Sequence, residues 1–140
     1  MTGSNPFSIS RVNVFERTLK TFVGKYSKGE RPKLKQCIAG LLNDLSLDPF
    51  RAGSAEEPLP DGLGLDRAVM SFRKFRLRYA KGASGQLRLI YIVFLEERIL
   101  TPIWIYSHEE YVKRPPVSMI SSAVREALDE LLEDDRDSGD

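Results

Sequence analysis

The sequence has little of several residue types on which common kinds of site depend. Its 140 residues include one cysteine, Cys37, and one histidine, His108. A single cysteine excludes a disulfide within the chain, and one Cys with one His cannot build a Cys/His metal centre. No glycine-rich phosphate loop is present. No apolar run approaches the roughly 20 residues of a membrane-spanning helix, and MTGSNPFSIS lacks the basic start and apolar core of a signal peptide. We expect a cytoplasmic protein that is not associated with a membrane and binds neither a metal nor a cofactor.

The chain as a whole has almost no net charge, but its acidic and basic residues are unevenly distributed along the sequence. The chain has 21 Lys and Arg against 20 Asp and Glu. Residues 126–140 carry eight acidic side chains and one basic one, so the first 125 residues carry 20 basic and 12 acidic. A basic body favours a polyanionic partner. We assign residues 133–140 to a disordered acidic tail. An alternative is that this tail folds over the basic face.

Apolar periodicity predicts a single α+β domain over residues 1–132. Spacings of three and four indicate amphipathic helices, and alternating or continuous apolar runs indicate strands. The predicted elements are a strand, a helical hairpin, three strands and a helix, at residues 7–14, 15–26, 32–45, 71–79, 86–95, 99–106 and 118–131. The order β-α-α-β-β-β-α predicts an antiparallel sheet with segregated helices.

Two stretches interrupt this pattern. Residues 48–66 contain three prolines and three glycines, which predicts a long surface loop within the domain. Pro102 lies inside the last strand-like run. Because proline has no N–H to donate to a strand ladder, it predicts an edge position or a bulge.

Basic residues concentrate in one part of the chain. Between Arg67 and Arg88, inclusive, there are seven basic residues and no acidic one. Lys74, Arg76 and Arg78 share one face of a predicted strand, about 7 Å apart, which roughly matches the phosphate repeat of an extended nucleic-acid strand. Arg88 is predicted to join them from the adjoining strand. A solvated strand face is the alternative, but such a face usually mixes both signs of charge.

Few other residues predict chemistry. His108 directly follows the last predicted strand, and a histidine can exchange a proton near neutral pH. An exposed loop histidine without a function is the competing interpretation. Cys37 occupies an apolar helix position and is expected to be a core residue. No spacing in the sequence predicts a Ser-His-Asp or Cys-His pairing.

The stretch from Lys74 to Tyr111 resembles the RelE/ParE superfamily of bacterial type II toxins. The matching features are the basic strand, a short glycine-containing loop before an Arg-apolar-apolar-Tyr strand (SGQLRLIY, residues 84–91), a turn of charged residues and an apolar strand. The preceding strand and helical hairpin match the family's order, so the likeness covers most of residues 7–115. The long loop, Pro102 and the acidic tail depart from it.

The resemblance implies a RelE-like domain that a small antitoxin protein neutralises. RelE-like members cleave mRNA on the ribosome without a metal, by attack of a ribose 2′-OH on the adjacent phosphate, whereas ParE-like members poison DNA gyrase. The implied catalytic residues are Arg88, His108 and Tyr111, with Tyr106 less favoured than Tyr111. The implied RNA-phosphate ligands are Lys74, Arg76, Arg78 and Lys81. A non-catalytic module of the same fold that binds RNA or protein is the alternative.

Overall fold

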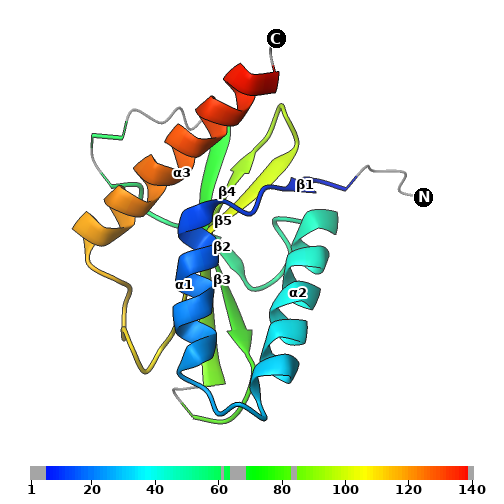
Figure 1. The fold of residues 1–140 in the computed structure, drawn as a ribbon, viewed down its shortest axis with the longest axis vertical. Coiled ribbons are helices and arrows are strands. Elements are labelled where there is room, and N and C mark those ends of the chain that lie inside the picture. The colour runs from blue at the N-terminus through cyan, green and yellow to red at the C-terminus, as the bar shows by residue number, and fades with distance from the viewer. Residues whose placement is uncertain (1–5, 61, 64–68, 83–84, 139–140) are drawn as a thin grey trace.

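A computed structural model describes residues 6–60, 62–63, 69–82 and 85–138, with side chains up to residue 134. It confirms the predicted α+β class and adds one short strand to the predicted elements (Figure 1). The predicted strand at residues 7–14 is shorter than expected, because only Ser8–Ile9 pair and α1 already begins at Asn13. The elements are β1 (Ser8–Ile9), α1 (Asn13–Gly24), α2 (Arg31–Leu47), β2 (Ser54–Glu56), β3 (Met70–Arg78), β4 (Gln86–Phe94), β5 (Ile99–Ser107) and α3 (Val117–Ser138).

The described strands form one five-stranded sheet in the order β1-β5-β4-β3-β2. The three predicted strands β3, β4 and β5 pair antiparallel with one another, as predicted, and β2 pairs antiparallel with β3. Strand β1 instead pairs parallel with β5, through Ser8 opposite Ile99 and Ile9 opposite Leu100. The sheet is therefore mixed, with a very short parallel strand at one edge and the three-residue β2 at the other.

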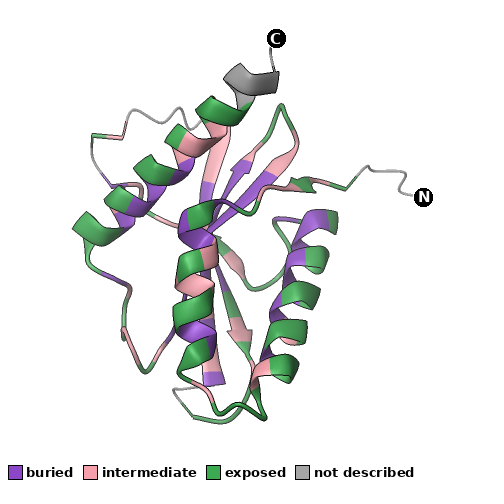
Figure 2. Ribbon diagram, viewed as in Figure 1, coloured by how far each residue is buried: buried purple, intermediate pink, exposed green. Residues whose placement is uncertain are grey.

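Helices cover both faces of the sheet. Helices α2 and α3 lie on opposite sides of it, and α1 lies between them, packed against β5 (Figure 1). The buried residues of the helices gather on the sides that face the sheet (Figure 2). Strand β4 is in the middle of this arrangement, and its residues 89–93 are all buried. This position explains why its sequence is almost entirely apolar.

The predicted bulge at Pro102 is present. Ile90 of β4 pairs with Trp104, whereas Tyr91 pairs with Pro102, so Ile103 is the extra residue on β5. Strand β5 lies between β1 and β4 and is not an edge strand. A bulge lets an interior strand contain a proline, because the ladder is interrupted there.

Two segments expected to lack regular structure are partly ordered. Strand β2 lies inside the predicted 48–66 loop, and α3 continues through Ser138, into the segment assigned to the acidic tail. Residues 61, 64–66, 139 and 140 of these segments are outside the described residues.

Candidate nucleic-acid interface

The strand register brings basic residues of β3 and β4 directly opposite each other. Arg76 pairs with Arg88, and Arg88 pairs on its other side with Tyr106 of β5. Directly opposite residues in an antiparallel pair have Cβ atoms roughly 5 Å apart. We call Arg76, Arg88 and Tyr106 the arginine–tyrosine row. The structure thus confirms that Arg88 shares a sheet face with the basic residues of β3.

The basic end of this face is open to solvent. Phe72, Ile90 and Ile92 on the same face are buried, whereas Arg76 and Arg78, further along β3, are exposed. Helix α3 packs against β5, and its buried residues belong to the same core cluster as Phe72, Ile90 and Ile92. The accessible surface is therefore the end of the sheet formed by the end of β3 and the start of β4.

Lys74 is on the predicted face but is not part of the accessible surface. Its side chain is 10% exposed, and its Nζ lies 3.1 Å from Oε1 of Glu57. Glu57 is 9% exposed and also accepts a hydrogen bond from Nη1 of Arg114 at 3.2 Å. The strand pattern predicted a solvent-facing ammonium beside Arg76. It missed the carboxylate, which follows a strand that was not predicted.

The Arg88 guanidinium lies in an electrostatically unfavourable position for a cation. Burial lowers the pKa of Arg88, and the neighbouring Arg76 lowers it further. The guanidinium donates to the carbonyl oxygen of Leu87 at 3.1 Å and to Oε1 of Gln86 at 3.4 Å. A phosphate bound between the two arginines would relieve their repulsion and accept charge-assisted hydrogen bonds from both.

Tyr106 supplies a neutral hydroxyl at the end of the row. The residue is 1% exposed, and its hydroxyl donates to the carbonyl oxygen of Lys113 at 3.2 Å. Burial raises the pKa of Tyr106 to about 12; Glu57 adds to this, while Arg88 and the other nearby arginines oppose it. The phenol is therefore protonated at neutral pH, so it can donate a hydrogen bond but does not act as a base.

The other predicted site residues lie around the row. Tyr111 is half-buried, and its ring meets that of Tyr106 edge-on, with centroids 5.8 Å apart. His108 is half-buried just past the end of β5, and its backbone N–H donates to the carbonyl of Gln86 at 2.8 Å. Lys81 is exposed in the turn between β3 and β4. The structure thus gathers these residues at the same end of the sheet.

Sequence reasoning missed two contributors to this region, Glu57 and Arg114. Glu57 directly follows the short β2, and Arg114 lies seven residues beyond the end of β5. Neither residue is part of a run in which apolar residues recur at helix or strand spacing. Their placement depends on contacts between residues 17 and 57 positions apart in the sequence. The only local signal is the sequence Arg-Pro-Pro at residues 114–116, which is typical of the end of a strand and does not indicate an ion pair.

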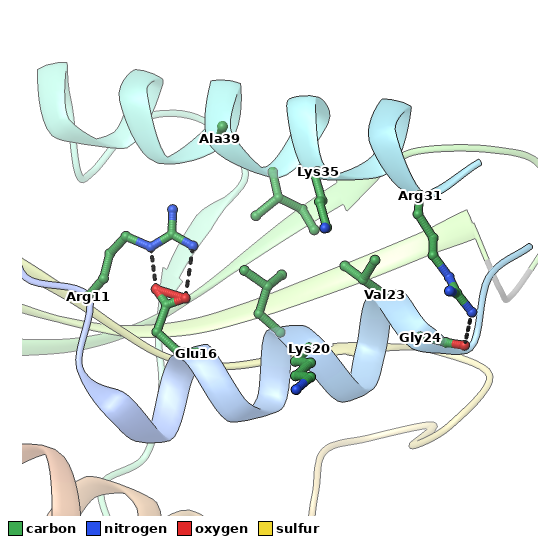
Figure 3. Close-up of a pocket in the computed structure, with 10 residues that line it drawn as sticks. Arg11, Glu16, Lys20, Val23, Gly24, Arg31, Lys35 and Ala39 are labelled. Atoms are coloured by element: carbon green, nitrogen blue, oxygen red, sulfur yellow. Dashed lines mark hydrogen bonds and ion pairs between the residues drawn. The ribbon is translucent and has the colours of Figure 1, made fainter. Parts of the chain in front are cut away.

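A second concave surface lies between α1 and α2 (Figure 3). We call it the helical groove; its volume is about 620 Å³. Its floor includes Leu19, Val23 and Ile38. Its rim carries one carboxylate, Glu16, which is paired with one of four cations: Arg11, Lys20, Arg31 and Lys35. The groove is thus apolar at its centre and mainly basic at its rim.

No three of the described His, Cys, Asp and Glu residues gather in a way that could hold a metal ion. No helix within the described ranges is long and apolar enough to cross a membrane.

The chain was compared with protein-family models, curated proteins and solved structures. No protein-family model matches the sequence, and no curated protein matches it. Among solved structures, the chain is similar to a mutant of the Escherichia coli toxin RelE in the free state. The two are 18% identical, with a TM-score of 0.39, over 89% of this chain and 97% of that one.

Proposed function

We propose that this chain is a RelE-like toxin that cleaves mRNA on the ribosome without a metal. The observation that carries the proposal is the arginine–tyrosine row. At one end of the sheet it combines an exposed arginine, Arg76, and a half-buried one, Arg88, with the buried, neutral phenol of Tyr106. The row lies within the stretch of sequence that resembles the RelE/ParE superfamily. Lys81 and Arg78 extend its positive charge along β3 and the following turn.

The row suits the charge that develops during RNA cleavage. When a ribose 2′-oxygen attacks the adjacent phosphorus, the phosphorane gains negative charge, which Arg76 and Arg88 would stabilise. The 2′-OH proton passes to a base, the P–O5′ bond breaks, and the leaving oxygen takes a proton from an acid. The products are a 2′,3′-cyclic phosphate and a 5′-hydroxyl. We assign proton transfer to His108 and orientation of the substrate to Tyr111, whose ring packs against the buried ring of Tyr106.

Induced expression tests this proposal. We expect the parent protein to stop growth and to produce cleaved mRNA on ribosomes, and we expect Arg88→Ala and His108→Ala to abolish both effects. Arg51→Ala is a matched control, because Arg51 is paired with Asp44 of α2, on the other side of the sheet. If Arg88→Ala and His108→Ala arrest growth as strongly as the parent, the assigned mechanism is wrong.

A non-catalytic module that binds RNA is the second candidate. One observation favours it: the Tyr106 hydroxyl is buried and already bonded to a backbone carbonyl. This candidate predicts salt-sensitive RNA binding with no cleavage product. A ParE-like action on gyrase would instead produce DNA damage upon induction, with mRNA left intact.

We further propose that the cognate antitoxin places an acidic amphipathic helix in the helical groove. An apolar floor with a basic rim complements a helix that has an apolar stripe between acidic residues. Lys20→Glu together with Lys35→Glu should prevent rescue by the co-expressed antitoxin, while toxicity without it persists. Lys28→Glu, in the turn after α1 and outside the groove lining, is the control. Full rescue of the double variant would exclude the groove.

A further inference from the structure

A buried carboxylate bridges two cations beside the arginine–tyrosine row. Glu57 contacts Nζ of Lys74 with Oε1 at 3.1 Å, and Nη1 of Arg114 with Oε2 at 3.2 Å. These residues line a shallow groove of about 520 Å³, together with Lys113 and prolines on either side. Both oxygens of one anion are thus held by two cations in a surface depression.

The Glu57 carboxylate lies between the two cations in the way that a bound phosphate could. A phosphate, like a carboxylate, presents oxygens that two cationic donors can bind at once. Lys74 is two residues from Arg76 on the same face of β3, so the groove lies about 7 Å from the row. That distance is close to the spacing between phosphates in an extended strand, roughly 6–7 Å when its bases are unstacked.

Glu57 is placed so that its side chain can leave without unfolding the strand. It directly follows the edge strand β2, and its backbone N–H is bonded to the carbonyl of Phe72 at 2.9 Å. Rotation of the side chain keeps that bond intact. An incoming phosphate would take the carboxylate's place, so neither Lys74 nor Arg114 would be left as an uncompensated buried charge.

We propose that Lys74 and Arg114 form a second phosphate subsite, which Glu57 keeps masked. RNA gains this contact only when the Glu57 carboxylate is displaced, so Glu57 limits how many phosphates the protein engages. This inference rests on the proposed RNA binding by the row. Its ligand is a phosphate of the same RNA strand that the row holds.

Glu57→Gln tests the subsite against Glu56→Gln, a neighbouring exposed carboxylate on β2. Both substitutions add one unit of positive charge, but only the first frees two cations. Binding of a fluorescein-labelled single-stranded RNA is measured by anisotropy from 50 to 300 mM KCl. Each freed phosphate contact steepens the salt slope by about 0.7, equal to roughly fivefold tighter binding near 0.1 M salt. We expect this increase in salt slope for Glu57→Gln, and less than about half of the increase for Glu56→Gln. Equal effects of the two would overturn the subsite.

A charge-neutral double variant covers the case in which Glu57→Gln does not fold. Glu57→Gln with Lys74→Met removes the ion pair and leaves Arg114 free, with the net charge unchanged. We expect it to bind RNA more tightly than Lys74→Met with Glu56→Gln, which has the same net charge; equal or weaker binding would overturn the inference.

A second measurement separates this inference from the proposed function. Inorganic phosphate at 50 mM should raise the Tm of Glu57→Gln, which keeps both Lys74 and Arg114, more than that of wild type, with chloride at the same ionic strength as the control. This readout does not use RNA. If wild type shows no salt-dependent RNA binding while phosphate stabilises the variant, the proposed function fails and the subsite stands. If phosphate and chloride act alike, the subsite fails.

Discussion

Replacing Lys74 with Met should change stability and leave RNA binding almost unaltered. Met has nearly the volume of the lysine stem, so the substitution mainly removes the ammonium. In wild type the Lys74 side chain is 10% exposed, and its ammonium is paired with Glu57. Its charge is therefore balanced within the protein, and it contributes little to the field that an RNA strand meets outside.

The expected loss of stability follows from the contacts of Glu57. Removing one partner of a buried ion pair costs about 3–5 kcal/mol when the other charge is left alone. Glu57 keeps its contact with Arg114 at 3.2 Å, and Arg114 is itself 22% exposed. We therefore expect about half of that cost, roughly 2 kcal/mol. For a chain of this size the Tm should fall by about 6–10 °C.

Urea unfolding followed by the fluorescence of the single tryptophan, Trp104, measures the free energy of unfolding. The same proteins are titrated with labelled RNA at several salt concentrations. Arg76→Ala is the paired comparison, because Arg76 is exposed. It should leave stability within about 0.5 kcal/mol and reduce the salt slope by about 0.7. The reasoning is refuted if Lys74→Met reduces the salt slope as much as Arg76→Ala and leaves stability unchanged.

Three further substitutions have expected outcomes. Burial raises the pKa of the Tyr106 phenol to about 12, above its unfolded value of 10. The stability linked to this shift is complete below pH 10 and is lost as pH rises through 12. The loss is at most about 2.7 kcal/mol. Tyr106→Phe should therefore show a flatter stability profile between these pH values, and parallel wild-type and variant profiles would contradict it. Tyr91→Phe removes a buried hydroxyl that donates to the carbonyl of Pro49 at 2.6 Å, which should cost about 1–2 kcal/mol in urea unfolding; a change below 0.5 kcal/mol would speak against that bond. In Gly85→Ala, the new Cβ would lie 2.2 Å from the carbonyl oxygen of Ala80, so calorimetry should show a loss of about 1–3 kcal/mol, and an unchanged Tm would be inconsistent with this turn.

The fold was predictable where burial imposes a period on the sequence. A helix that buries one stripe and a strand that packs against helices on both faces must show these patterns, as α1 and β4 do. The Ser-Ala-Glu of β2 is too short and too polar to show either. It pairs with β3 because it lies beside that strand in the fold. The parallel pairing of β1 with β5 likewise depends on tertiary structure, because the two strands are far apart in the sequence.

The sequence alone determined which basic side chains share a face, because a strand alternates its side chains whatever surrounds it. Arg76 and Arg88 were assigned to one face from that rule, and the register places them opposite each other. Only the tertiary structure decided which cations remain accessible. Lys74 has the same alternation as Arg76, but Glu57 approaches it from a different part of the chain. Local periodicity encodes the direction of a side chain, whereas burial and charge pairing depend on residues distant in sequence.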